Sequence, residues 1–405
     1  MMKYFKLFEE CYLVNGDKKD AIYNILSGDI FSVESDEKKL LVQTENNISI
    51  VDACKEAGIN ICIAKTFFDK LIDYRLGSYS ETPITAEKLE LLPKWMEKMF
   101  FKLPPVINRS TISLGNQCNL ECDFCGSKNK TNKLKCLTCT GNESNEIDFI
   151  ELEKAYQIID LLVKYECTEL YLKGGNLLLN WNILKYIIDY SLKSGIKNVV
   201  LNLVSSIEEI EVIEYLRKNN ISLMIQKYIT EDYDIQNIIN DIKKYEGINH
   251  MHLFLADYKI KNYVFNFYNL LIQNNIKNIM FDFIVPSELN LVPPEYIKDL
   301  STLQRVSIES LSINKKYNPC FYKSCHFDNI GNIYPCSGLL DFKYGDIDNI
   351  ANTFKEENLN TFWKFNKDSL PKCKLCELRY ACNDCRGLTY SLTGDLYENI
   401  VCMKK

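Results

Sequence analysis

Six short runs rich in β-branched and aromatic residues alternate with longer helical patterns between residues 110 and 286. They are Ser110 to Gly115, Cys167 to Gly175, Asn198 to Ser206, Ile221 to Gln226, His250 to Ala256 and Asn278 to Pro286. The stretches between them carry apolar residues at steps of three and four, which is typical of amphipathic helices. Strands that are joined through helices pair in parallel with right-handed crossovers. The pattern therefore predicts an α/β fold built on a parallel sheet.

Three cysteines follow the first of these strands, in the segment QCNLECDFCGS. Cys118, Cys122 and Cys125 have the spacing C-x3-C-x2-C. Iron–sulfur clusters are held by thiolates, and three ligands on one loop indicate a 4Fe–4S cluster whose fourth iron is left for an external ligand. The alternatives are three buried core cysteines or part of a zinc site.

Composition narrows the class of protein. A length of 405 residues predicts two or three domains, and the net charge of −6 argues against a nucleic-acid partner bound through its phosphates. Glu9 and Glu10 interrupt the apolar N-terminus, which predicts no signal peptide, and no run reaches the roughly 18 apolar residues of a membrane span. We therefore expect a cytoplasmic protein with no membrane partner, in which clustered cysteines among the 17 are metal ligands rather than disulfides.

A second group of eight cysteines lies near the C-terminus. Three surround a predicted hairpin, CHFDNIGNIYPC, and four follow as C-x2-C-x5-C-x2-C before a last one. They are Cys320, Cys325, Cys336, Cys373, Cys376, Cys382, Cys385 and Cys402. Eight thiolates make two full sets of four, which suit two clusters or two structural zinc sites.

The three-cysteine motif, with Phe124 before its last cysteine, resembles the signature of the radical S-adenosylmethionine (SAM) enzymes. The resemblance implies that the amino and carboxylate groups of SAM take the free iron, and that the reduced cluster splits SAM into methionine and a 5′-deoxyadenosyl radical. It also implies that residues 110–305 form a partial (β/α)6 TIM-like barrel. SAM would lie where the strands end, against residues at three strand ends: Gly174, Gly175 and Asn176, then Ser205 and Ser206, and Gln226. Asn176 replaces a glutamate of the family motif, and Val204, Ser205 and Ser206 stand where a Thr-Asn-Gly is frequent.

The C-terminal cysteines resemble the SPASM extension of radical SAM peptide maturases, which implies a SPASM domain over residues 306–405. Gly331 fits the glycine of its pattern, whereas Cys385 comes one residue early. The resemblance implies one auxiliary cluster on Cys320, Cys325, Cys336 and Cys385. It implies a second on Cys373, Cys376, Cys382 and Cys402, and so three 4Fe–4S clusters in all.

Residues 1–90 have a different rhythm, with short strands broken by Gly16 and Gly28, then two helical patterns and a wing-like strand, GSYSETP. This order predicts a winged-helix module. Its acidic residues and lack of a basic stripe argue against DNA binding. The module resembles the precursor-recognition domain of enzymes that modify ribosomally made peptides, where a leader peptide adds a strand to an exposed sheet edge. Residues 91–109 are expected to form a linker.

Six cysteines remain outside these sets. Cys11, Cys54 and Cys62 lie in apolar patterns and are predicted core residues. Cys136 and Cys139 form a C-x2-C pair that could bind a further metal, pair under oxidation, or line the mouth of the barrel. Cys167 opens the second strand and is a candidate hydrogen-atom donor to a substrate radical.

The resemblance covers the whole chain and implies a radical SAM/SPASM oxidoreductase that matures a ribosomally made precursor peptide. The modification would be a thioether, carbon–carbon or carbon–oxygen crosslink, or an epimerisation. An electron donor such as flavodoxin or ferredoxin is implied. The opening segment YFKLFEECYLVNGDKKDAIYNI further resembles grasp-with-spasm maturases, which implies an ATP-grasp ligase acting on the same peptide. The alternatives are a sulfatase-type oxidase that matures a folded protein, and a non-catalytic iron–sulfur partner that presents a peptide.

Overall fold

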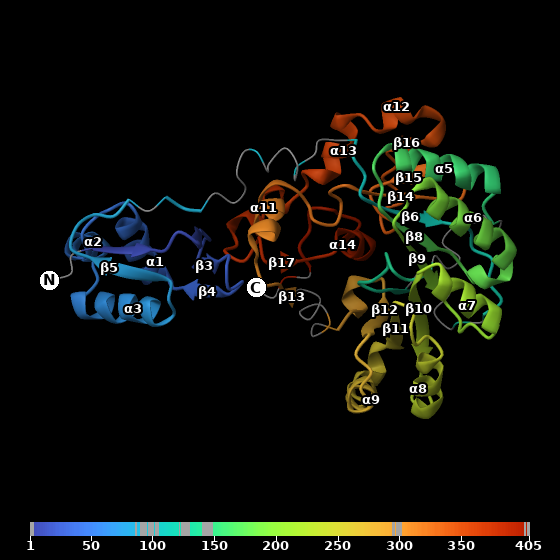
Figure 1. The fold of residues 1–405 in the computed structure, drawn as a ribbon. Coiled ribbons are helices and arrows are strands. Elements are labelled where there is room, and N and C mark those ends of the chain that lie inside the picture. The colour runs from blue at the N-terminus through green and yellow to red at the C-terminus, as the bar shows by residue number, and fades with distance from the viewer. Residues whose placement is uncertain are drawn as a thin grey trace. The chain divides into compact units, whose positions relative to one another are not determined.

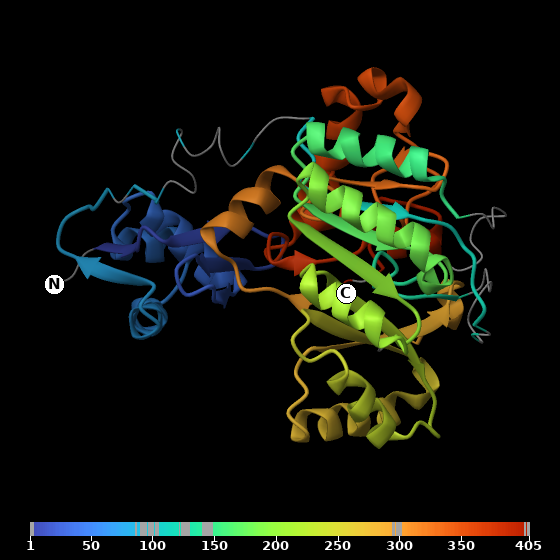
Figure 2. The ribbon, with the colours of Figure 1, turned by 45° about the vertical axis from the view of Figure 1, so that its right-hand side comes forward.

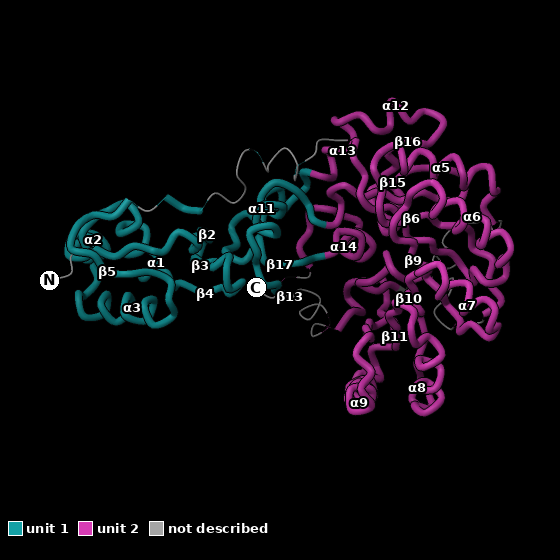
Figure 3. The backbone as a smooth tube through the Cα atoms, in the orientation of Figure 1, with its two compact units in different colours: residues 1–102, 301–319, 364–384 teal, residues 103–300, 320–363, 385–405 magenta. Residues whose placement is uncertain are grey.

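The computed structural model describes residues 4–85, 87–89, 95, 101, 105–120, 122, 130–139, 149–293, 296, 302–400 and 402. It divides into two compact units (Figure 3). Unit 1 comprises residues 1–102, 301–319 and 364–384, and unit 2 comprises residues 103–300, 320–363 and 385–405. The predicted C-terminal domain is thus shared between both units. The reason is that Val306, Leu311 and Tyr380 share one apolar core with Val14 and Tyr23.

Unit 2 is built on a sheet that has ten strands in the described part of the chain, in the order β16-β15-β14-β6-β8-β9-β10-β11-β12-β7 (Figure 1). Its six central strands confirm the six predicted from the sequence, and they pair in parallel. These are β6 (Arg109–Ser113), β8 (Glu169–Lys173), β9 (Asn198–Leu203), β10 (Ser222–Ile229), β11 (His250–Asp257) and β12 (Ile279–Pro286). One edge adds β14 (Ser324–Phe327), parallel to β6, and then the antiparallel β15 (Asn332–Tyr334) and β16 (Gly345–Asp346). The other edge adds β7 (Lys130–Thr131), antiparallel to β12.

In the described ranges, five helices connect the parallel strands. They are α5 (Leu152–Lys164), α6 (Trp181–Ser194), α7 (Ile210–Lys218), α8 (Ile235–Lys243) and α9 (Lys261–Gln273). Figure 2 shows α5 and α6 running side by side along the sheet. Helix α6 ends at Gly195, whose φ of +107° is a left-handed conformation that favours glycine.

The pleat gives the sheet two distinct faces, because residues that pair across strands share a face. One face, here the outer face, packs against helices, as Phe254 and Ala256 do against α8 and α9. The other, here the inner face, carries Leu253 and Leu255. The strand register places seven further residues on the inner face: Thr111, Ser113, Tyr171, Lys173, Asn202, Gln226 and Asp282.

The N-terminal part of unit 1, over the described residues 4–80, contains two small antiparallel sheets and three helices. The sheets are β1 (Tyr4–Leu7) with β5 (Gly77–Ser80), and β2 (Cys11–Val14), β3 (Asp20–Asn24) and β4 (Ile30–Val33). The helices are α1 (Ser35–Glu45), α2 (Ile50–Ala57) and α3 (Ile61–Asp73). The predicted strands and the two predicted helices are present, and β5 is the predicted wing-like strand. Helix α1 was not predicted, although Glu34 and Glu37 form a capping box at its start.

The isolated cysteines of unit 1 are only partly core residues. Cys11 and Cys54 are buried, as predicted. The prediction for Cys62 is wrong, because its side chain is exposed. Helix α3 buries Ala64, Phe67, Phe68 and Leu71, and Cys62 lies on the opposite side of the helix from these residues.

The remaining elements extend the C-terminal part of both units. In unit 1, α11 (Ile308–Lys316) is followed by β17 (Cys382–Asn383), which pairs with β13 (Thr302–Leu303). Unit 2 adds α12 (Ile350–Thr353), α13 (Glu356–Trp363) and α14 (Arg386–Thr393). Among the described residues, no helix has both the length and the apolar character needed to cross a bilayer.

Candidate functional site

The three-cysteine loop follows β6 directly, at the carboxyl end of that strand. Cys118 is exposed and Cys122 is half-buried. Phe124 and Cys125 lie outside the described residues. The carboxyl ends of parallel strands are where α/β folds gather their ligands, so the loop begins in a suitable place.

Two glycines at the carboxyl end of β8 hold the start of this loop against the sheet. A Cβ on Gly175 would lie 2.2 Å from Gln117 O, and one on Gly174 would lie 2.6 Å from Gly115 O. The Gly175 N–H donates to Gly115 O at 2.9 Å. Residues with a side chain cannot approach a neighbouring backbone so closely. These glycines, which the resemblance implies to be SAM contacts, therefore also fix the chain that leads to Cys118.

Asn176 extends this attachment to the cysteine loop itself. Its Nδ2 donates to Asn119 Oδ1 at 2.8 Å, one residue beyond Cys118, and its backbone N–H donates to Gln117 O at 2.8 Å. Its Oδ1 accepts from Ser205 Oγ at 3.3 Å. A single buried amide thus joins the ends of β8 and β9 to the loop. The structure brings three predicted residues together here: Asn176, Ser205 and Cys118.

Ser206 and Gln226, the other two polar residues predicted to contact SAM, form hydrogen bonds with other residues of this chain. Ser206 Oγ donates to Asp241 Oδ2 at 2.8 Å, and Asp241 is in turn paired with Lys227. Gln226 is buried, and its Oε1 accepts from the Cys139 N–H at 2.9 Å. Both side chains therefore hold other parts of this chain in the structure.

Residues 130–139 form a segment that lies across the inner face, here called the inner segment. Side chains from three further strands hold its backbone, besides Gln226. Lys173 Nζ donates to Lys135 O at 3.2 Å, Asn202 Nδ2 donates to Leu137 O at 3.0 Å, and Leu134 N donates to Asp282 Oδ2 at 2.8 Å. Leu134 and Leu137 pack against the apolar residues of the same face. The sequence analysis does not predict this role, and the one visible signal is Asp282, the single charged residue of the apolar strand IMFDFIVP.

Asp282 is a carboxyl group of the inner face whose pKa is strongly shifted. Burial raises its pKa to about 6, although the N–H groups of Leu134 and Phe283 and the Tyr296 hydroxyl donate to it. An ordinary aspartate in an unfolded chain has a pKa of about 3.9. The folded state therefore binds this proton more tightly than the unfolded state does.

This shift predicts a pH dependence of stability. The contribution of Asp282 is fully present below about pH 4 and is lost as the pH rises through about 6. Between pH 5 and pH 7.5 we expect Asp282 to lower the free energy of unfolding by about 1 kcal/mol. The variant Asp282→Asn, whose amide oxygen can still accept from Leu134, should lack this slope. Urea unfolding of both proteins at the two pH values measures the difference, and equal slopes would contradict it.

Lys173 and His326 lie together on the inner face beside the inner segment. Lys173 is buried, and its Nζ also donates to Ser337 Oγ at 3.3 Å. Burial, and then the charge of Lys173, lower the pKa of His326 to about 3. The imidazole lies 3.5 Å from Ser113 Oγ. The histidine is therefore neutral at physiological pH, and buried Lys173 contributes a positive charge to this region.

All four cysteines assigned to the first auxiliary cluster belong to unit 2. Cys325 is buried in β14, Cys320 is exposed, and Cys336 and Cys385 are half-buried. Cys385 is the N-cap of α14, where its Sγ accepts from Leu388 N at 3.3 Å. A Cβ on Gly387 would lie only 3.2 Å from Gly338 Cα, so the chain segments at Cys336 and Cys385 are closely packed.

The cysteines assigned to the second auxiliary cluster are divided between the units. Cys373, Cys376 and Cys382 lie in unit 1, and Cys402 lies in unit 2. The Cys376 N–H donates to Cys373 O at 2.8 Å, which folds this C-x2-C pair into a turn. Cys382 begins β17. The thiols of unit 1 are thus presented from one short, turn-rich stretch, as cluster ligands are in other proteins.

Cys167 lies at the amino end of β8. Its Sγ donates to Glu169 O at 3.4 Å, and burial raises its pKa to about 12. At about 3.3 Å per residue, the strand separates Cys167 from Gly174 by roughly 20 Å. This position does not suit a donor of hydrogen atoms to a radical formed at the carboxyl ends of the strands.

Within the described ranges, no three cysteine, histidine or acidic side chains surround one point as the ligands of a single metal ion would. A four-iron cluster holds its thiolates farther apart than one ion does, because each thiolate binds a different iron. The chemistry of the donor set, thiols alone at eleven assigned positions, fits iron–sulfur clusters.

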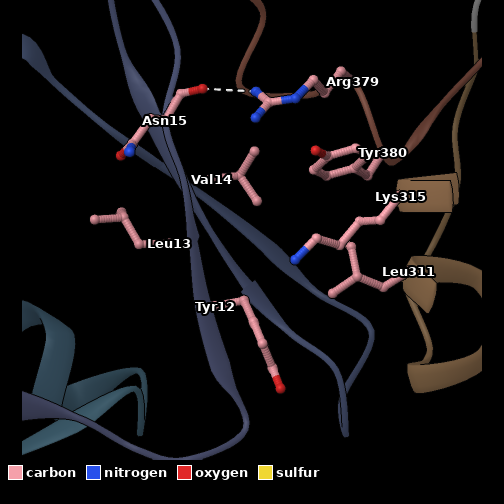
Figure 4. A pocket seen from close by; sticks show the side chains of 8 residues that line it. All are labelled: Tyr12, Leu13, Val14, Asn15, Leu311, Lys315, Arg379 and Tyr380. Carbon is pink, nitrogen blue, oxygen red and sulfur yellow. Dashed lines mark hydrogen bonds between the residues drawn. The ribbon is translucent and has the colours of Figure 1, made fainter. Parts of the chain in front are cut away.

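A cavity of about 130 Å³ lies beside β2 within unit 1 (Figure 4). Its lining includes Tyr12 and Val14 of β2, Lys315 of α11, and Tyr380. Arg379 Nη1 donates to Asn15 O at 2.7 Å at one end of the cavity. In the described sheet, β2 pairs with β3 alone, so its other edge adjoins this space.

Known proteins provide a comparison of fold. No protein-family model matches this chain. MJ0907, an uncharacterised protein of Methanocaldococcus jannaschii, is 25% identical over 268 residues, which make up 56% of this chain and 84% of that protein. The solved structure of anSMEcpe with bound AdoMet has a TM-score of 0.53 and 15% identity, and covers 72% of this chain and 93% of its own. The same protein with AdoMet and a Kp18Cys peptide has a TM-score of 0.51 at 15% identity, covering 69% and 90%. This likeness shows that the chain shares the fold of anSMEcpe over these residues.

Proposed function

We propose that this chain is a radical SAM peptide maturase with three 4Fe–4S clusters. Cys118, Cys122 and Cys125 would hold the cluster that binds SAM. When bound, cluster and SAM supply a 5′-deoxyadenosyl radical, which abstracts hydrogen from a carbon of the peptide. The observation that carries the proposal is the attachment of the three-cysteine loop to the ends of β8 and β9 through Gly175 and Asn176.

The residues around this loop have defined parts in the proposal. Gly174 and Gly175 keep the loop close to the sheet, so that backbone groups at the strand end would be available to the amino group of SAM. Asn176 and Ser205 orient the loop through their hydrogen bonds, and the same side chains could form further hydrogen bonds with SAM. Buried apolar side chains of the inner face, such as Leu253 and Leu255, exclude water from the space in which a radical would react.

The auxiliary clusters would carry electrons away from the substrate radical as a new bond forms. A cytoplasmic flavodoxin or ferredoxin would supply the electron for SAM cleavage. Buried Lys173, whose Nζ donates to Ser337 Oγ next to Cys336, would place a positive charge near the first auxiliary cluster, where it would favour the reduced, more negative state.

Residues 1–90 would act as the winged-helix-like module that binds the leader of the precursor peptide. Among the described strands β2 pairs with β3 alone, so its other edge could take an added strand, and the adjoining cavity offers Tyr12, Val14 and Tyr380 to the apolar side chains of that strand. This N-terminal part favours a peptide maturase over a sulfatase-type oxidase. An ATP-grasp ligase acting on the same peptide remains the proposed partner.

Two measurements on one protein test the proposal. Anaerobically reconstituted protein with SAM and dithionite should form 5′-deoxyadenosine. A precursor peptide co-expressed with this protein should lose two hydrogens in the mass spectrum if a crosslink forms, and keep its mass with an altered stereocentre if the reaction is an epimerisation. A protein that carries its iron and cleaves no SAM would contradict the proposal.

A further inference from the structure

Cys136 lies in the inner segment, and that segment is tied to the chain next to Cys336. Lys173 Nζ donates both to Lys135 O at 3.2 Å and to Ser337 Oγ at 3.3 Å. One buried ammonium group thus holds the residue before Cys136 close to the residue after Cys336. These two cysteines are therefore presented to the same region on the inner side of the sheet.

Two more cysteines reach this region from other directions. The close contact of Gly338 with Gly387 brings the chain at Cys385 beside the chain at Cys336. Arg109 Nη2 donates to Cys320 O at 3.4 Å, and Arg109 shares its face of the sheet with Tyr171 and Lys173. Cys320, Cys336 and Cys385 thus gather on the side of the sheet where Cys136 lies.

Electrostatic effects agree with this grouping. Burial, and then the charges of Cys336, Cys136 and Cys320, raise the pKa of Cys385. The same kind of effect reaches Tyr171 of the inner face, whose pKa is raised to about 12 by burial, by Glu169 and, in part, by Cys136. The charges of Cys336, Cys136 and Cys320 all act on Cys385, so these three thiols lie near it.

Cys325 is on the other face of the sheet. It pairs with Ser110, and the pleat places both of them opposite to Thr111 and His326. Its Sγ lies 3.6 Å from Ser110 Oγ, and burial together with the charge of Cys167 raises its pKa. The thiol is therefore directed away from the face that carries Tyr171 and Lys173.

We propose that Cys136 is the fourth ligand of the auxiliary cluster held by Cys320, Cys336 and Cys385, in place of Cys325. The inference rests on the proposed three-cluster function and deepens it. With this ligand, the inner segment that crosses the sheet would connect the barrel to the auxiliary cluster. Cys139 serves the other end of the segment, where Gln226 holds it.

The test starts from a parent protein in which Cys118, Cys122 and Cys125 are alanine, so that only auxiliary iron remains. Three variants of this parent are compared: Cys136→Ala, Cys139→Ala and Cys325→Ala. Iron and sulfide are counted, and EPR spectra are recorded after dithionite reduction and after mild oxidation. Cys139→Ala is the matched control, since it removes the other thiol of the same C-x2-C pair.

The proposal expects Cys136→Ala to leave one auxiliary cluster with an iron that no protein thiolate binds. Mild oxidation should then remove about one iron per chain and produce the EPR signal of a three-iron cluster. Cys139→Ala and Cys325→Ala should match the parent. Circular dichroism checks folding, and the exposed position of Cys136 allows alanine without a core cavity.

Other results would distinguish Cys136 from Cys325 as the fourth ligand, and this assignment from the three-cluster function. Loss of iron in Cys325→Ala, with Cys136→Ala equal to the parent, would overturn the inference and restore the assignment that the sequence pattern implied. The structure offers one observation in favour of that outcome. Besides burial, the charges of Cys325 and Cys336 both raise the pKa of Tyr344, so both thiols lie near this hydroxyl. A parent without any iron would overturn the three-cluster function itself, and the inference with it.

Discussion

Replacing Cys118, Cys122 and Cys125 together with alanine should reduce formation of 5′-deoxyadenosine to the level without enzyme. The reason is that no other thiols lie on the loop that Gly175 and Asn176 hold at the strand ends. The triple variant should lose about four iron atoms per chain and keep those of the auxiliary sites. Anaerobic assays with SAM and dithionite, together with iron analysis, measure both effects.

A matched control uses the exposed thiol of unit 1. Cys62→Ala removes a solvent-accessible cysteine that is remote in sequence from every assigned cluster, and it should retain both the iron and the activity. If the triple variant still cleaves SAM, then the radical is generated elsewhere and the assignment of this loop is wrong.

Gly175→Ala should have the second-largest effect. Its new Cβ would lie 2.2 Å from Gln117 O and 2.7 Å from Asn116 O, both of which are backbone atoms that cannot rotate away. The loop must move, and displacement of a catalytic group by about 1 Å can lower a rate about a hundredfold. We therefore expect SAM cleavage to fall on that scale and overpacking to cost about 1–3 kcal/mol of stability.

Gly195→Ala controls for the stability loss alone. A Cβ there meets nothing within 4 Å, and the left-handed φ of +107° makes alanine unfavourable by about 1–2 kcal/mol. This residue caps the carboxyl end of α6, just before β9 begins, whereas the described start of the cysteine loop lies at the carboxyl ends of the strands. Thermal unfolding and SAM cleavage should therefore separate the two variants: both lose stability, and Gly175→Ala alone loses activity. Equal activities would mean that the loop tolerates the displacement.

The regular part of the fold could be predicted from local patterns. The six parallel strands and their order follow from runs such as ISLMIQ, because alternation with helices leaves few ways to pair them. Helix α1 was missed, since its charged sequence SDEKKLLVQTE has a weak apolar periodicity even though its capping box was readable. Cys62 was misplaced because an apolar neighbourhood does not say which side of a helix is buried.

Of the candidate site, the sequence predicts only the three-cysteine motif and the glycines that follow β8. The spacing of Cys118, Cys122 and Cys125, and the glycines after β8, are visible in the sequence because each belongs to one short segment. The contacts of Ser206 with Asp241, and of Gln226 with Cys139, join segments that are distant along the chain. No local pattern encodes such partners, so the assumed SAM contacts there stay predictions.

The sequence alone determined the thiols available for metal, the strands that carry them, and the loop that presents the first three. Only the tertiary structure decided which face of the sheet each thiol occupies. Cys325 and His326 are adjacent in the chain, yet the pleat directs them to opposite faces. Lys173 brings residues 135 and 337 together across about two hundred positions. The spacing of cysteines shows how many thiols could be ligands, but strand register and long-range hydrogen bonds fix the direction in which each side chain points.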